Sequence, residues 1–254
     1  MALSPKTKNK VVEYGFYSIL FTAAGLLSQF LAGKITLDVI ENGCEQHPEA
    51  CDQYEDPAKT SLTESAKDTL IAGSIISAMI GGLGSLAIYS MLNAIRARYF
   101  NKNATKSERA ELLTSTDIQP SFFKSVKQTF NKSNSIFTLA SATTVVTAFA
   151  TICAGISSLF LEETLCPDDY INGRICGNYP HASDDQMGLM DELGHKAAGT
   201  LTGSAFGLSL GTGLIIALTM VGFSAYMSRR QDAATAQSKG LAETVTSSAY
   251  TGGY

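Results

Sequence analysis

Long apolar stretches without a charged residue alternate along the chain with segments that carry almost all of its charge. The charge-free stretches are residues 14–33, 69–95, 133–161 and 197–228, and each has at least 20 residues. Roughly 20 helical residues cross the hydrocarbon core of a bilayer, so such runs are typical of membrane spans. The pattern predicts an all-α integral membrane protein, a bundle of four transmembrane helices, with the first span extending back to residue 11.

The overall composition hides these spans. Hydrophobic residues make up 45% of the 254 residues, and the mean hydropathy is only +0.09. That value is an average over apolar spans and very polar connecting segments. The presence of four such spans excludes a soluble enzyme, a nucleic-acid-binding protein and a disordered chain. We expect the lipid bilayer, together with further copies of the chain or other membrane proteins, to be its partners, and no nucleic acid.

The connecting segments differ sharply in charge. Residues 1–10 hold three lysines and no acid, and 96–132 hold eight basic against three acidic residues. By contrast, 34–68 hold three basic and nine acidic residues, and 162–196 hold two and eight. Short segments rich in Lys and Arg stay on the cytoplasmic side of a membrane. We therefore expect both termini and the basic loop inside and both acidic loops outside, in a plasma or vesicle membrane, with the mitochondrial inner membrane as the alternative.

Four of the five cysteines lie in the acidic loops, one pair in each. Cys44 and Cys51 share the first loop, and Cys166 and Cys176 share the second. One close pair in each outward loop indicates two local disulfides in an oxidising compartment. The alternative is metal binding, because Cys44, His47 and Cys51 have ligand-like spacing. A structural zinc site needs four ligands, however, and these loops offer only two further histidines.

The second half of the chain matches the first at a constant offset of 130 residues. The identical pairs include Ala24 with Ala154, Ser28 with Ser158, Gly73 with Gly203 and Gly81 with Gly211. One offset that serves both spans favours a tandem duplication of a two-helix hairpin, with copies at 11–95 and 133–228. Chance similarity between membrane segments of restricted composition is the alternative. Two spans per unit give both copies the same orientation in the membrane.

Small residues recur at every fourth position in two of the spans. The fourth span has Gly199, Gly203, Gly207 and Gly211, and the second has Gly73, Ser77, Gly81 and Ser85. Such stripes let helix backbones approach closely in lipid, where no hydrophobic drive brings helices together. We interpret them as helix-packing or oligomerisation faces. Packing inside the bundle is the alternative, and it carries more weight for the second span than for the fourth.

The cytoplasmic segments carry two further predictions. In the basic loop, an apolar helical face alternates with lysines: Phe122, Phe123, Val126 and Phe130 with Lys124 and Lys127. This pattern indicates a short helix at the membrane interface, and a linker without regular structure is the alternative. Residues 229–254 are rich in Ala, Ser, Thr and Gly, a composition that cannot form a packed core, so we expect a flexible tail.

No motif in the chain indicates catalysis. Gly207-Leu208-Ser209-Leu210-Gly211 matches the G-x-S-x-G pattern, but that motif needs a strand-to-helix turn with a histidine nearby. Here it lies within a predicted span, and the nearest histidine is roughly 21 Å of helix away. We expect no enzyme, no metal centre and no cofactor.

The sequence predicts function only broadly, as a non-enzymatic structural or assembly component that oligomerises through its small-residue faces. Two alternatives stay open: a subunit of a large-pore channel, or an accessory subunit of a multi-protein complex. The plan of four spans, inward termini and Cys-bearing outer loops resembles synaptophysin-like vesicle proteins, claudin-like junction proteins and innexin- or connexin-like channels. The resemblance covers topology alone, and no functional residue is carried over from those families.

Overall fold

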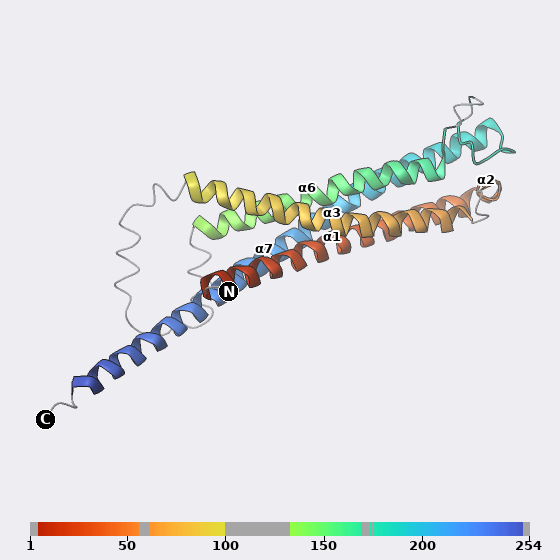
Figure 1. Cartoon of the computed structure of the whole chain (residues 1–254). Helices are drawn as coiled ribbons and strands as arrows, with labels where there is room; N and C mark the ends of the chain where they lie inside the picture. Colours follow the sequence, from red (N-terminus) through yellow and green to blue (C-terminus); the bar gives the residue numbers. More distant parts are fainter. Residues whose placement is uncertain (1–4, 56–60, 100–132, 169–172, 174, 251–254) are drawn as a thin grey trace.

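The computed structural model describes residues 5–55, 61–99, 133–168, 173 and 175–250. Its long helices are α1 (Pro5–Gln46), α3 (Leu62–Tyr99), α6 (Ser133–Leu165) and α7 (Asp184–Tyr250), with α2 (Pro48–Cys51) as a single turn. No strand occurs in these described ranges. The long helices run side by side as an elongated bundle (Figure 1), which confirms the all-helical fold class.

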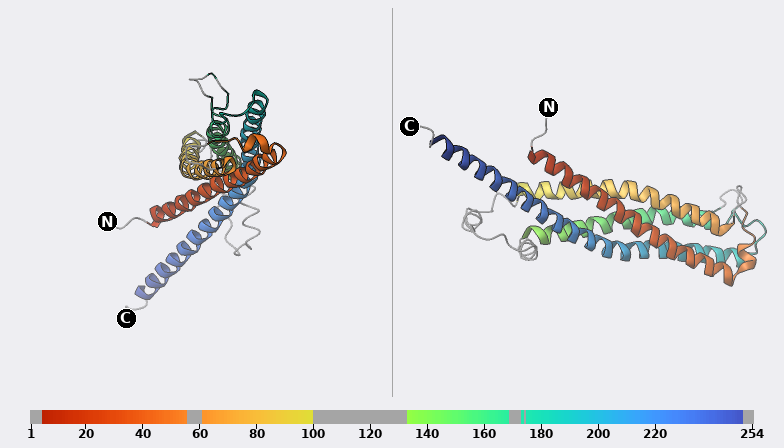
Figure 2. Two further views of the ribbon diagram at one scale, coloured as in Figure 1. Left: turned by 90° about the vertical axis from the view of Figure 1, so that its right-hand side faces the viewer. Right: turned by 90° about the horizontal axis from the view of Figure 1, so that it is seen from below.

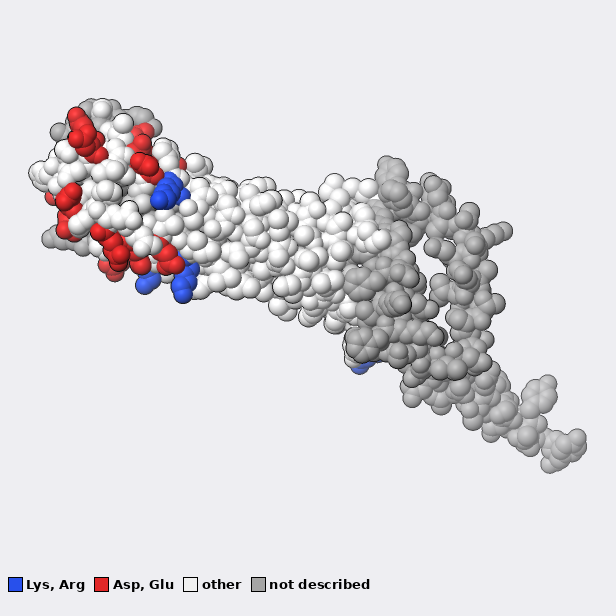
Figure 3. All heavy atoms as spheres, turned by 180° about the vertical axis from the view of Figure 1, so that it is seen from behind, with Lys and Arg blue, Asp and Glu red and all other residues white. Residues whose placement is uncertain are grey.

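Each long helix packs against two neighbours. α1 lies against α3 and α7, and α6 lies against the same two helices, so that α1 and α6 make only minor contact across the bundle. Both chain termini leave the bundle at one end, which we call the terminal end (Figure 1). Acidic side chains gather at the opposite end, the acidic end, which holds the described residues of 34–68 and 162–196 (Figure 3).

The four predicted spans are confirmed in number and order. Four helices are long and apolar enough to cross a membrane, over Val11–Gln46, Leu62–Ile95, Ile136–Leu165 and Asp184–Met227. Large apolar side chains are exposed along all four in the middle of the bundle, for example from Val11 to Ile35 on α1. These 25 residues span about 37 Å, a length suited to a tilted crossing of the roughly 30 Å hydrocarbon core. We call this belt of exposed apolar side chains the apolar band.

At the acidic end the helices continue well beyond the predicted spans. α1 ends at Gln46 rather than near residue 33, and α7 starts at Asp184 rather than near residue 197. Much of each predicted loop is therefore helical, and the first connection between the long helices shrinks to residues 47–61, where α2 lies.

The reason for these extensions is amphipathic spacing. On α1, Thr36 and Ile40 are buried while Asp38 and Glu41 are exposed, so the charged segment keeps an apolar face toward its neighbours. α7 repeats the pattern, with buried residues at Met190, Leu193 and Ala197. The helices of the bundle therefore continue beyond the apolar band, and the surface of this extension is charged.

The interior consists of two apolar clusters separated by a small polar layer. The cluster at the acidic end includes Ile40, Leu161, Leu165, Tyr179, Met190 and Leu201. The cluster at the terminal end includes Tyr17, Phe21, Tyr89, Val146, Ala217 and Met220. Between them lie buried polar residues, among them Ser28, Gln29, Ser77 and Ser209. Small hydroxyl side chains there allow close helix approach and hydrogen bonds between helices.

Beyond the terminal end of the bundle, α7 continues as a helix through Tyr250 and projects away from the other helices (Figure 2). The helix over 229–250 was not expected from the composition, and the flexibility of the tail stays a prediction. The physical reason for the helix is that no proline interrupts 229–250, which holds several Ala, Gln, Lys and Glu residues with high helix propensity and a single glycine, Gly240. The interfacial helix predicted around Phe122–Phe130 lies outside the described residues.

Candidate functional site

The small-residue stripe of α3 faces the interior of the bundle. Ser77, Gly81 and Ser85 are buried, and Gly73 is partly buried. A Cβ atom added to Gly73 would lie 2.7 Å from Ser157 Oγ, and one added to Gly81 would lie 3.7 Å from Cys153 Sγ. Both neighbours belong to α6. The stripe therefore brings α3 close to α6 within one chain, as small residues do in membrane bundles.

The stripe of α7 has the opposite environment. Gly199, Gly203, Gly207 and Gly211 are all exposed. A Cβ atom built on any of the four would find no atom of another helix within 4 Å. Phe206, Leu210 and Leu214 are exposed beside them, so the stripe lies within the apolar band. We call these four glycines the α7 glycine face. It is a lipid-level strip of backbone that no described part of the chain covers.

In the polar layer, hydrogen bonds connect α1 to both helices of the second hairpin. Gln29 Nε2 donates to the Ala150 carbonyl oxygen at 2.6 Å, in a buried position. The hydroxyls of Ser28 and Thr212 lie 2.9 Å apart. A cavity of about 10 Å³ lies beside Gln29, between α1, α3 and α6. A water molecule needs at least about that much space, so this cavity is far too small for an organic substrate.

Both predicted disulfides are confirmed at the acidic end. Cys44 bonds to Cys51 with a Cα–Cα distance of 5.6 Å, and Cys166 bonds to Cys176 with 4.1 Å. Cysteines joined in this way offer no thiolates, so the alternative of a zinc site built on Cys44, His47 and Cys51 loses its ligands. Among the described residues, no group of three His, Cys, Asp or Glu side chains is placed to hold a metal ion.

The two disulfide-bearing connections meet each other. The Glu55 amide donates to the Asn178 carbonyl oxygen at 2.8 Å, and the rings of Tyr54 and Tyr179 lie 5.6 Å apart. Tyr179 is almost fully buried, and its hydroxyl has no partner within the described structure. Burial raises the pKa of the Tyr179 phenol above its ordinary value, because it disfavours the charged form. The acidic end is therefore a packed unit rather than two independent loops.

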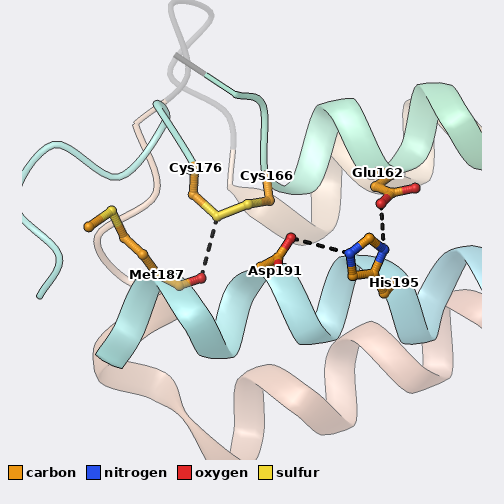
Figure 4. Close-up of a disulfide and its surroundings, with 6 residues drawn as sticks. All are labelled: Glu162, Cys166, Cys176, Met187, Asp191 and His195. Carbon is orange, nitrogen blue, oxygen red and sulfur yellow. Dashed lines mark hydrogen bonds and ion pairs between the residues drawn. A yellow bond between two sulfur atoms is a disulfide. The ribbon is translucent and has the colours of Figure 1, made fainter. Parts of the chain in front are cut away.

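A histidine ties α6 to α7 beside the second disulfide (Figure 4). His195 Nδ1 lies 2.5 Å from Glu162 Oε1 on α6, and His195 Nε2 lies 3.5 Å from Asp191 Oδ1 one turn away on α7. On the far side of Asp191, Cys176 Sγ lies 3.5 Å from the Met187 carbonyl oxygen. All three side chains of the His195 contact are partly exposed to water, so its contribution to stability is modest.

The contacts of the acidic end were not predicted from the sequence. The spacing of four residues between Asp191 and His195 could have indicated their pairing on a helix. Nothing local indicates that Glu162 joins them, because that contact depends on how α6 packs against α7.

No known protein family, no curated protein and no solved structure matches the chain.

Proposed function

We propose that this protein is a non-enzymatic membrane component that assembles with further copies of itself through the α7 glycine face. The observation that carries the proposal is the exposure of four glycines at lipid level with nothing from the described chain against them. Glycine offers lipid no side chain to pack against, whereas it lets a second helix approach the backbone closely. Dispersion and weak Cα–H···O contacts then hold the two helices together.

The topology that accompanies this proposal has the acidic end outside and both termini in the cytoplasm. It rests on the excess of Lys and Arg in 1–10 and 96–132. The two disulfides at the acidic end support it, since disulfides persist in oxidising compartments. A plasma or vesicle membrane is the favoured location.

A tandem duplication of one hairpin is also part of the proposal. Some positions 130 residues apart have matching environments on α1 and α6: Ala24 and Ala154 are buried, Ser28 and Ser158 are buried, and Phe30 and Phe160 are exposed. Others differ, because Gln29 is buried and Leu159 is exposed. α3 and α7 differ, because Gly81 is buried and Gly211 is exposed. The support for the duplication is therefore the constant offset in the sequence together with these matching positions.

The channel alternative receives less support. It requires the Thr- and Ser-rich face of the third span to line a pore shared between copies. In the bundle, Thr147, Ser157 and Ser158 of α6 are buried within their own chain. The accessory-subunit alternative makes a different prediction about the particle, namely a fixed ratio with unrelated chains.

The test is the mass of the native particle in a mild detergent, for the wild type and two leucine variants. Gly207→Leu places a side chain in the α7 glycine face. Gly155→Leu is the matched control, because a Cβ atom there also has nothing within 4 Å but lies on α6. We expect the wild type and Gly155→Leu to contain several identical copies and Gly207→Leu to approach the 26.9 kDa monomer. A wild-type monomer, or a fixed complex with unrelated chains, would refute self-assembly.

A further inference from the structure

Three exposed lysines mark the edge of the apolar band at the acidic end. Lys34 lies on α1, Lys67 on α3 and Lys196 on α7, and α1 packs against both of the other helices. In the space-filling view, Lys and Arg atoms at this end lie at the border between the uncharged shaft and the acidic surface (Figure 3). We call these three residues the lysine patch.

Helix contacts and apolar neighbours fix the depth of the patch. A Cβ atom built on Gly33 would lie 3.6 Å from Leu70, three residues after Lys67, so Lys34 and Lys67 lie within about one turn of the same depth. Ile35 is exposed directly beside Lys34. Lys196 is the last charged residue before the charge-free stretch of α7. All three ammonium groups therefore lie where contact with hydrocarbon ends.

An exposed acid accompanies the lysine on each of the three helices. One turn farther from the apolar band, each lysine has an exposed acid: Asp38 for Lys34, Glu64 for Lys67 and Glu192 for Lys196. Spacings of three or four residues allow ion pairs on a helix. In the described structure none of these three lysines forms an ion pair with its acid. On α1 and α7 the lysine is thus the charged residue nearest the apolar band, whereas on α3 the exposed Asp68 lies one residue nearer to it than Lys67.

We infer that the lysine patch binds the phosphate groups of anionic phospholipids in the adjoining leaflet. Lipid phosphates lie just outside the hydrocarbon core, at the depth of the patch. A lysine stem covers apolar surface while its ammonium group, with three N–H donors, reaches a headgroup. The acids one turn farther out remain in water.

The binding is one-sided around the bundle. At this edge α6 carries Glu162 and Glu163 and no lysine. Anionic lipid therefore gathers along α3, α1 and α7 and is repelled along α6. The inference rests on membrane insertion of the four helices and not on the proposed self-association.

The test compares the association of spin-labelled phosphatidylglycerol and phosphatidylcholine with the full chain in phosphatidylcholine vesicles. The variant is the triple change Lys34→Gln, Lys67→Gln and Lys196→Gln. We expect its preference for phosphatidylglycerol to fall at least about twofold below that of the wild type, because each cation near a charged membrane surface contributes to the attraction. Replacement of all three by arginine keeps the charge and keeps the preference.

The matched control neutralises the three acids one turn farther from the apolar band on the same helices, with Asp38→Asn, Glu64→Gln and Glu192→Gln. These changes leave the lysines in place, so the preference for phosphatidylglycerol stays or rises. Two results would overturn the inference: an unchanged preference in the glutamine triple variant, or a loss in the arginine variant equal to that in the glutamine variant. Particle mass, measured on the same samples, reports separately on self-assembly.

Discussion

Two single alanine substitutions separate packing within the chain from the uncovered face of α7. Gly82 is buried on α3, where an added Cβ atom would contact Thr22 Oγ1 and lie 2.8 Å from Thr22 Cα and 3.0 Å from Thr22 Cβ. Gly207 is exposed on α7, where an added Cβ atom meets nothing within 4 Å. We therefore expect Gly82→Ala to destabilise the chain and Gly207→Ala not to.

The magnitude follows from this geometry. Non-bonded carbon atoms pack at about 3.5–4.0 Å, so the new methyl group at Gly82 overlaps backbone carbon by about 1 Å. Because the atom is Thr22 Cα, α1 and α3 must separate, and overpacking of this kind costs about 1–3 kcal/mol. Both variants gain the same helix propensity of alanine over glycine, about 1 kcal/mol. That gain cancels in the comparison, which leaves Gly82→Ala less stable than Gly207→Ala by about 2 kcal/mol.

The assay is reversible denaturation of the two variants in detergent, at a concentration where both are monomeric, followed by helical circular dichroism. Dilution matters, because self-association would add its own concentration-dependent stabilisation to one variant and not the other. Equal free energies of unfolding would refute the close approach of α1 and α3 at Gly82. A Gly207→Ala monomer that is clearly less stable than the wild type would refute the uncovered position of the α7 glycine face.

Three further predictions follow from buried groups. Gln29→Leu removes the hydrogen bond to the Ala150 carbonyl oxygen, and the free energy of unfolding should fall by about 0.6–1.7 kcal/mol, as for other interhelical hydrogen bonds in membranes; no fall would contradict the bond. Tyr179→Phe removes a buried hydroxyl that has no partner in the described structure, so stability should be unchanged or higher by up to about 1 kcal/mol. Because burial raises the pKa of Tyr179, the unfolded chain loses this proton first as the pH rises. The contribution of Tyr179 to stability is then constant below about pH 10 and falls above it, and alkaline denaturation of Tyr179→Phe should show a shallower fall. Finally, alkylation in denaturant should modify one cysteine, Cys153, before reduction and all five after it; mass spectrometry that finds any other number before reduction would contradict the two disulfides.

The sequence predicts well those features that depend only on residues close together in the chain. Four charge-free runs are enough to predict four spans, because the cost of placing a charge in hydrocarbon applies residue by residue. Cysteine pairs seven and ten residues apart are enough to predict both disulfides. The helix ends at the acidic end were not predicted, because each span was taken to end at the first charged residue. Thr36 and Ile40 are buried one turn apart while Asp38 and Glu41 are exposed, so the helical periodicity of the same residues indicated the correct helix end.

The features that the sequence does not predict depend on which helices become neighbours. Gly81 and Gly211 sit in stripes of the same spacing, yet one lies against Cys153 on α6 and the other meets nothing within its own chain. The spacing of the small residues predicts that a helix has a smooth face. The environment of that face depends on how the other three helices pack. The contact of Glu162 with His195 was hidden for the same reason.

The two stripes also differ in what glycine accomplishes. On α3, the absence of a side chain at Gly73 leaves room for Ser157, so the residue has a packing role inside the chain. On α7, residues such as Leu201 and Ala205 make the buried contacts, while the α7 glycine face lowers helix propensity by about 4 kcal/mol in total with no contact to offset it. If that face touches only lipid, alanine at all four positions should raise the stability of the chain and leave the native particle unchanged. If a second α7 covers it, the same four alanines should stabilise the monomer while they hold the helices apart, and the particle should dissociate. Stability measured on the monomer and mass measured on the native particle therefore move in opposite directions only if the α7 glycine face is an interface.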